Sequence, residues 1–225
     1  MHTKYIEKLE EMLMELLFTD SERNAIGSFD DAMDQLVNIF LNVKESGHKL
    51  FFIGNGGSAA DAEHIVGELM KGFLLSRRLD EELHNELRRA DPEKGEYLAD
   101  KLQGALPAIA VVDHLALSTA FLNDVDPLLG MAQQVNGYGA EGDVFLGITT
   151  SGNSKNILYA NTIAKAKGLK TVALTGKDGG QIKEMSDVSI IVPEEETFKI
   201  QELHLPIYHC LCLMLEEYFF GEESV

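Results

Sequence analysis

Residues 50–58 of this chain read Leu-Phe-Phe-Ile-Gly-Asn-Gly-Gly-Ser, an apolar run that ends in a glycine-rich turn. Four consecutive apolar residues indicate a strand buried on both faces, as in a parallel sheet covered by helices. The glycines let the backbone turn sharply and approach a ligand closely, and Ser58 is a candidate N-cap for a following helix. Strand, turn and helix in this order predict an α/β fold with its ligand site at the carboxyl ends of the strands.

Short apolar runs of the same kind alternate with helical patterns along the rest of the chain. The expected strands are Leu50–Ile53, Ala108–Val112, Val144–Ile148, Thr171–Leu174 and Val188–Val192. The expected helices are Ala59–Phe73, Leu115–Leu122, Pro127–Val135, Ser154–Lys167, a short one after Gly180, and Lys199–Phe220. With right-handed crossovers, this alternation predicts a three-layer, doubly wound α/β domain around a five-stranded parallel sheet. At this length, a single domain over residues 1–225 is the simplest division of the chain.

Residues 1–47 precede the first strand and predict two amphipathic helices. In the first, apolar residues from Ile6 to Leu17 recur at helical spacing. The second is expected to start at Ser28, with Asp31 placed three residues later to complete the cap.

Residues 74–106 form a strongly charged insert before the second strand. Helix formers on either side of Asp91-Pro92 predict two short helices that the proline separates. Mixed-sign charge of this kind is more typical of a solvated helical hairpin than of a dedicated binding site.

The composition narrows the classes of partner. Asp and Glu outnumber Lys and Arg by 37 to 19, and such a negative field repels nucleic acid and membrane surfaces. No apolar stretch approaches the length of a membrane span, and the first residues do not resemble a secretory signal, so we expect a cytoplasmic protein. The two cysteines, Cys210 and Cys212, are expected to be packing residues.

Three loops that follow expected strands have unusual compositions. The first is Gly54–Ser58, the second is Thr149-Thr150-Ser151-Gly152-Asn153-Ser154, and the third is Thr175–Gly180. The second opens directly into a helix and offers hydroxyls and helix amides to an anion without any cation. The first lacks the third glycine of a dinucleotide fingerprint, and no expected strand ends in the Gly-Lys-Ser/Thr of a Walker loop.

These residues resemble the sugar isomerase (SIS) domain family and, within it, the phosphoheptose isomerases. The resemblance covers most of the chain outside the insert and is strongest in residues 54–64, 150–154, 174–180 and 200–204. It implies an enzyme that isomerises a phosphorylated sugar, with sedoheptulose 7-phosphate as the expected substrate. It further implies a homotetramer with its sites between subunits, the second loop holding the phosphate and the first loop gripping the sugar.

The resemblance also implies a zinc site and a catalytic pair. The residues that match the family's zinc ligands are His64, Glu68, Gln201 and His209, and nitrogen and oxygen donors suit Zn²⁺. Spacing alone places His64 and Glu68 on one helical face, which would equally suit an exposed ion pair, and it does not prefer His209 over His204.

Glu68 and His209 are the expected acid and base that move protons through an enediol. The residues expected to contact substrate are Asn55, Gly56, Gly57, Ser58, Asn123, Asp124, Thr149, Thr150, Ser151, Ser154 and Gln201. For Asn123-Asp124, a turn that ends a helix is an equally good interpretation.

The sequence departs from the family's residue pattern at two places, and the family offers two alternative functions. Lys71-Gly72 stands where these isomerases commonly have Gly-Arg, and Lys199 stands where Arg is common, which gives a point charge in place of a planar fork.

The family also contains non-catalytic tetramers that act as adaptors for replication initiators, and sugar-phosphate sensors fused to transcription regulators. The retained candidate ligands argue against the adaptor, and the sequence has no basic DNA-binding segment to support the sensor.

Overall fold

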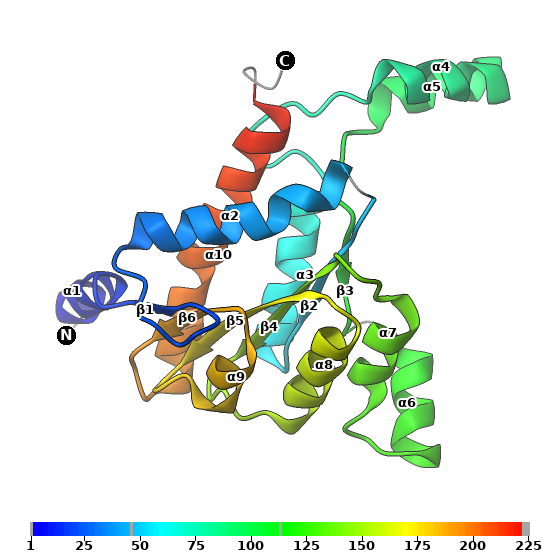
Figure 1. The fold of residues 1–225 in the computed structure, drawn as a ribbon. Helices are drawn as coiled ribbons and strands as arrows, with labels where there is room; N and C mark the ends of the chain where they lie inside the picture. The colour runs from blue at the N-terminus through cyan, green and yellow to red at the C-terminus, as the bar shows by residue number, and fades with distance from the viewer. Residues whose placement is uncertain (1, 46, 113, 222–225) are drawn as a thin grey trace.

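The computed structural model describes residues 2–45, 47–112 and 114–221, and it is an α/β fold built on a mixed six-stranded sheet (Figure 1). The strand order is β1-β6-β5-β4-β2-β3. Strands β2 to β6 run parallel to one another, and they are Leu50–Ile53, Ala108–Ala110, Val144–Thr149, Lys170–Gly176 and Val188–Val192. These are the five predicted strands, with β2 and β6 at the predicted bounds.

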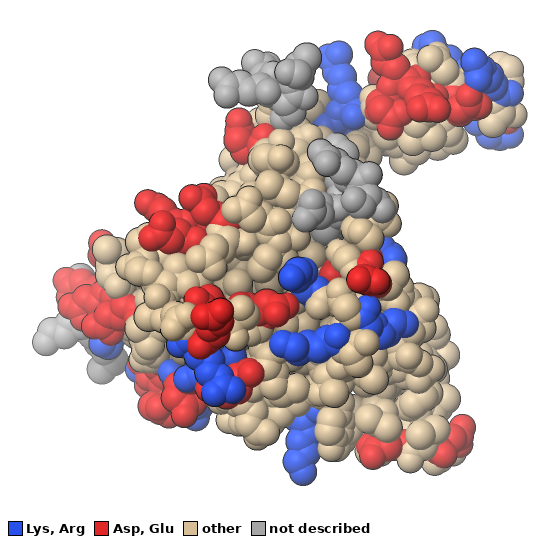
Figure 2. Space-filling model, in the orientation of Figure 1, with Lys and Arg blue, Asp and Glu red and all other residues tan. Residues whose placement is uncertain are grey.

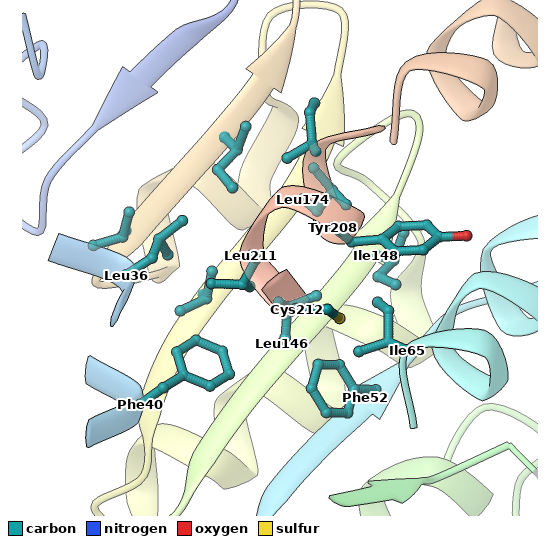
Figure 3. Packing of buried hydrophobic residues seen from close by; sticks show 14 of the residues in the cluster. Leu36, Phe40, Phe52, Ile65, Leu146, Ile148, Leu174, Tyr208, Leu211 and Cys212 are labelled. Atoms are coloured by element: carbon teal, nitrogen blue, oxygen red, sulfur yellow. The ribbon is translucent and has the colours of Figure 1, made fainter. Parts of the chain in front are cut away.

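Helices cover both faces of the sheet, as the doubly wound prediction requires (Figure 1). Alternate residues of one strand enter different cores: Phe52 belongs to one apolar cluster, while Phe51 and Ile53 belong to the other. The first cluster includes residues of α1 (His2–Leu13), α2 (Phe29–Glu45), α3 (Gly57–Met70) and α10 (Thr197–Phe220), and Figure 3 shows part of it. The second includes residues of α7 (Gly130–Tyr138), α8 (Lys155–Ala166) and α9 (Gly180–Met185), while α6 (Leu115–Asp124) packs beside α7.

The sheet differs from the predicted one by an additional edge strand, β1 (Leu17–Thr19), which pairs antiparallel with β6. The first helix ends at Leu13, so the prediction that it continues to Leu17 is wrong. A turn separates the two elements, because Met14 donates its backbone N–H to Glu11 and Glu15 donates to Met12. A three-residue strand is too short to show the alternation of apolar and polar residues that predicts a strand, and its partner strand lies far away in the sequence.

The charged insert forms two short helices, α4 (Glu81–Ala90) and α5 (Pro92–Lys101), which confirms the predicted break at Asp91-Pro92. Asp91 caps α5 by accepting from two backbone amides. Figure 1 shows the pair projecting from the body as an arm, and Figure 2 shows that its surface mixes both signs of charge. The helices pack closely at Gly95, where a Cβ atom would lie 2.0 Å from the Leu87 carbonyl oxygen.

The strand order also determines where the unusual loops meet. β2 lies between β3 and β4, so the connection from β2 to β3 and the connection from β3 back to β4 run in opposite directions along the sheet. Ligands of open α/β sheets bind at such a switch point. The loops after β2 and β4 are therefore neighbours at the carboxyl edge of the sheet. Among the described residues, no helix is both long enough and apolar enough to cross a membrane.

Candidate active site

The hydroxyl-rich loop after β4 forms a concave turn at the start of α8. Thr149 is buried at the end of the strand, and its Oγ1 lies 3.0 Å from Oγ of Ser154, the N-cap residue of α8. Because the Ser154 side chain points to Thr149 and makes no capping hydrogen bond, it leaves the first amides of α8 to a ligand. Thr150 and Ser151 are half-buried in the turn, and the Ser151 hydroxyl accepts from the Asn153 amide at 3.2 Å. Hydroxyls and a helix N-terminus in one turn suit a phosphate group.

The shape of this loop depends on Gly152 and on the neighbouring loop after β5. Gly152 has a φ of 65°, and a Cβ atom there would lie 2.1 Å from the Gly179 carbonyl oxygen. Asn153 ties the two loops together, because its Oδ1 accepts from the Gln181 backbone amide at 3.1 Å. The loop after β5 therefore helps to fix the shape of the hydroxyl-rich loop.

The loop after β2 reaches the start of α8 through Asn55. Its amide forms a reciprocal pair with Asn156 of α8, with hydrogen bonds of 3.0 and 2.7 Å. Gly56, with a φ of 56°, is the N-cap residue of α3, and Gly57 and Ser58 are the first residues of the helix. Ser58 is buried inside the first turn, so the prediction that it caps the helix is wrong.

Three of the four predicted metal ligands lie together where α3 packs against α10. Nε2 of His64 is 3.4 Å from Oε1 of Glu68, and the His64 and His209 rings are 5.0 Å apart and nearly perpendicular. Nε2 of His209 is buried and has no hydrogen-bond partner. Burial lowers the pKa of His209, and the neighbouring His64 lowers it further, so the ring is neutral near pH 7.

Two further side chains enter this cluster that sequence reasoning did not assign to it. Lys71 donates from Nζ to Oε2 of Glu68 at 2.9 Å, so the unusual lysine lies directly beside the candidate catalytic carboxylate. The Tyr208 hydroxyl lies 2.9 Å from Nδ1 of His64, and Figure 3 shows the Tyr208 ring in the apolar cluster with its hydroxyl at the edge. Tyr208 directly precedes His209, but a tyrosine in an apolar helix is typical of a core residue. No sequence pattern indicates its contact with His64.

Asp61 lies one turn before His64 on α3 and adds a carboxylate to this group. Burial raises the pKa of Asp61, while the Tyr208 hydroxyl and His64 act in the opposite direction. Burial also raises the pKa of Tyr208, so its hydroxyl stays protonated at physiological pH. Asp61 and Tyr208 therefore both lie near the candidate ligand His64, and the Tyr208 hydroxyl contacts it directly.

Gln201 and His204 occupy a different part of α10. The Gln201 amide lies against the start of α3, where a Cβ atom on Gly57 would be 2.5 Å from Nε2 of Gln201. Gly57 precedes His64 by seven residues, about 10 Å along a helix. His204 is fully buried, and its Nε2 lies 3.2 Å from the carbonyl oxygen of Thr175. This hydrogen bond makes His204 a structural residue of the interior, which leaves His209 as the histidine beside Glu68.

Asn123 and Asp124 are exposed at the end of α6. Nδ2 of Asn123 donates to Oδ1 of Asp124 at 2.6 Å, and in the described part of the chain no hydrogen bond joins either residue to the two loops. Their predicted contact with substrate stays a prediction.

The donor types in the cluster suit zinc, and the unpartnered His209 nitrogen is free to bind it. The arrangement is not closed around an ion: within the described residues no three His, Cys, Asp or Glu side chains are placed to hold one. Lys71 occupies one oxygen of Glu68, and Gln201 lies at Gly57. The residues thus fit the predicted site by type, and the zinc assignment stays a prediction.

Comparison with known proteins gives independent evidence for the family to which this chain belongs. Residues 113–214 match the family model of the SIS domain. The chain is 38% identical to a phosphoheptose isomerase of Citrifermentans bemidjiense over 86% of this chain and 88% of that protein, and 36% identical to one of Sulfurimonas denitrificans over 97% of each. Among solved structures, phosphoheptose isomerases of Neisseria gonorrhoeae and Francisella tularensis superpose with TM-scores of 0.72 and 0.71, at 27% and 29% identity over 96% of each chain. The chain therefore belongs to the phosphoheptose isomerase family of SIS-domain proteins.

Proposed function

We propose that this protein interconverts sedoheptulose 7-phosphate and an aldoheptose 7-phosphate. The observation that carries the proposal is that one chain holds both an anion-binding turn and a carboxylate–imidazole cluster. An anion-binding turn opens α8, and a carboxylate with two imidazoles lies on α3 and α10. The Asn55–Asn156 pair joins the loops that begin these two regions. This grouping of polar side chains favours the enzyme over the non-catalytic adaptor and the sensor.

In the proposed mechanism, the turn from Thr149 to Ser154 binds the phosphate and thereby fixes one end of the open-chain sugar. The amides at the start of α8 supply the positive end of the helix dipole, so the acidic protein needs no basic surface for this step. Asn55, held by Asn156, presents its backbone and amide to the sugar.

Glu68 and His209 move the protons. Aldose–ketose isomerisation removes a proton beside the carbonyl and returns one to the neighbouring carbon, while the enediol oxygens exchange another. A base must be neutral before it accepts a proton, and burial, which lowers the pKa of His209, favours the neutral imidazole. Glu68 is the second proton carrier, and Lys71 balances its negative charge.

Zinc is part of the proposal. Held by His64, Glu68, Gln201 and His209, it would act as a Lewis acid that stabilises the charge developing on the enediolate oxygens. The Tyr208 hydroxyl orients His64 from behind by its contact with Nδ1.

We also propose a homotetramer with sites between subunits. An apolar groove of about 540 Å³ lies on the N-terminal side of the fold, and its lining includes Leu13, Met14, Phe29 and Pro206. A second copy of the chain would cover it. Asn123 and Asp124, which are exposed here, would then be available to a neighbouring copy's site. The cytoplasmic location stays a prediction.

The test is an isomerase assay of the purified protein on sedoheptulose 7-phosphate, with and without a chelator, alongside Glu68→Gln and His209→Ala. We expect each substitution to lower kcat at least 100-fold, the usual range for loss of an acid or base. Glu202→Gln, on an exposed part of α10, is the matched control and should keep most of the activity. A wild-type protein without turnover, or variants as active as the wild type, would overturn the proposal. Size measurement in solution tests the tetramer.

A further inference from the structure

A buried ion pair lies where the projecting arm joins the body. Nε of Arg77 donates to Oε1 of Glu216 at 2.8 Å, and the two residues are only 2% and 1% exposed. Arg77 belongs to the charged segment whose residues the sequence assigned to the surface, and Glu216 lies near the end of α10. Burying two charges is costly unless every polar atom finds a partner. The contacts of the two residues therefore indicate what the pair holds in place.

Glu216 holds the chain that leaves the catalytic helix. Its Oε1 accepts from the Phe73 backbone amide at 2.7 Å, and its Oε2 accepts from the amides of Leu74 and Leu75 at 2.7 and 3.1 Å. Burial raises the pKa of this carboxyl, but the amides and Arg77 outweigh the effect and hold it below its ordinary value. Glu216 is thus an ionised buried carboxylate that fixes residues 73–75.

Arg77 holds the end of α3 itself. Its Nη1 donates to the Leu69 carbonyl oxygen at 2.7 Å, and its Nη2 donates to the Glu68 carbonyl oxygen at 3.0 Å. These carbonyls belong to the last turn of a helix that ends at Met70, where oxygens lack partners within the helix. A cation at this end also complements the helix dipole. The planar guanidinium reaches two carbonyls and one carboxylate at once, which an ammonium group cannot do.

We infer that Arg77 is a positioning residue for Glu68, and that it acts through the backbone of the last turn of α3. The inference rests on the proposed role of Glu68 as a proton carrier. The Arg77 side chain is fully buried and 4.6 Å from the centre of the Phe220 ring, so it acts from behind the helix and touches no substrate. The root of the arm, residues 73–77, is in this way part of the support of the active site.

A displacement of the last turn would move the Glu68 carboxylate relative to His64 and His209. Misplacement of a reacting group by about 1 Å can lower a rate about 100-fold. The phosphate turn belongs to β4 and α8 and makes no hydrogen bond to Arg77 within the described residues. Loss of the Arg77 contacts should therefore reduce kcat and leave substrate binding nearly intact.

The experiment compares Arg77→Lys with Asp143→Asn. Asp143 is, like Arg77, a buried charged residue, and its carboxylate has backbone and lysine partners. It precedes β4 at the edge of the sheet opposite to the loops. Both variants should lose thermal stability. We expect Arg77→Lys to lower kcat about 10- to 100-fold, with KM changed less than about threefold, whereas Asp143→Asn at the same folded fraction keeps its kcat. Equal kcat values for the two variants would overturn the inference.

Amide hydrogen exchange supplies a readout that does not depend on turnover. The amides of residues 67–71 should exchange at least tenfold faster in Arg77→Lys than in wild type, and those of residues 149–154 should not change. Unchanged exchange at 67–71 would overturn the inference even if the wild type proves inactive, an outcome that by itself overturns only the proposed function. Should Arg77→Lys not fold, Phe220→Leu, which removes the ring beside the guanidinium, should give a smaller shift in the same two measurements, and no shift would overturn the inference.

Discussion

The side-chain amides of Asn55 and Asn156 form a reciprocal pair: each donates from Nδ2 to Oδ1 of the other, at 3.0 and 2.7 Å. The pair joins the loop after β2 to the first turn of α8, so one contact connects the loop that we propose faces the sugar to the turn that we propose binds the phosphate. Nδ2 of Asn156 also lies 3.3 Å from the sulfur of Met131, which places the amide beside a third element, α7.

Replacement of Asn156 should therefore weaken substrate binding although Asn156 was not among the predicted contact residues. Asn156→Ala removes two hydrogen bonds and leaves Asn55 free to rotate. At about 1 kcal/mol for each bond, kcat/KM should fall about 5- to 30-fold, mainly through KM. Steady-state kinetics on sedoheptulose 7-phosphate measures the change. Asn136→Ala on the exposed part of α7 is the control, and equal KM values for the two variants would contradict the role of the pair.

Gly152→Ala should damage the phosphate turn specifically. The residue has a φ of 65°, which costs Ala about 1–2 kcal/mol, and its Cβ would lie 2.1 Å from the backbone oxygen of Gly179. Because this oxygen belongs to backbone, the turn itself must shift. We expect KM for the sugar phosphate, and the inhibition constant of inorganic phosphate, to rise at least tenfold.

Gly168→Ala is the matched control for this prediction. Gly168, in the turn between α8 and β5, has a φ of 78°, but the atom nearest to its Cβ would be Cγ of the flexible Glu141 side chain at 3.1 Å, and the Glu141 backbone would be at an ordinary contact distance of 3.7 Å. This variant should lose stability and keep its KM. If Gly152→Ala binds phosphate as well as Gly168→Ala does, the phosphate belongs elsewhere.

The parts of the fold that the sequence predicted are those with a strong local signal. Leu50–Ile53 is an uninterrupted apolar run and Val188–Val192 is broken only by Ser189, and both strands have the predicted bounds. Asp91-Pro92 provides a cap and a helix start in adjacent residues, so the division of the arm was visible without tertiary information. β1 was missed because its three residues become a strand only by pairing with the edge of β6.

The contacts of the candidate site also divide into those that the sequence could predict and those that it could not. His64 and Glu68 could be paired from spacing, because both lie on one helix. Asn156, Tyr208 and Arg77 could not, because each acts across elements that the sequence does not place side by side. Arg77 has a further disadvantage: it stands in a run of surface-like charges, and only the fold shows that its side chain is buried.

Gly57→Ala should test where Gln201 acts. The added methyl group would lie 2.5 Å from Nε2 of Gln201, so the amide must move away from the start of α3. If Gln201 is a zinc ligand or a sugar contact from this position, the variant should bind less zinc or show a KM at least fivefold higher, as metal analysis and kinetics would report. Gly67→Ala, on the same helix with open space at its Cβ, is the control and should raise stability by about 0.5–1 kcal/mol. Unchanged metal content and KM in Gly57→Ala would contradict both roles of Gln201.

The buried imidazole of His204 should make the protein sensitive to mild acid. Burial lowers its pKa from 6.5 to about 4, and the carbonyl oxygen of Thr175 requires Nε2 to carry the proton, which leaves Nδ1 as a buried nitrogen without a partner. Since the folded pKa lies below the unfolded one, the unfolded chain binds more protons between these two values. The contribution of His204 to the free energy of unfolding is then complete above pH 6.5 and falls as the pH drops toward 4, by about 3 kcal/mol in total.

In His204→Gln the side chain can still donate to Thr175 but cannot titrate. Urea unfolding at pH 7.5 and pH 4.5 should show a smaller loss of stability in the variant, because the carboxylates that titrate in both proteins cancel in the comparison. Equal losses in the two proteins would mean that His204 accepts a proton without leaving the interior.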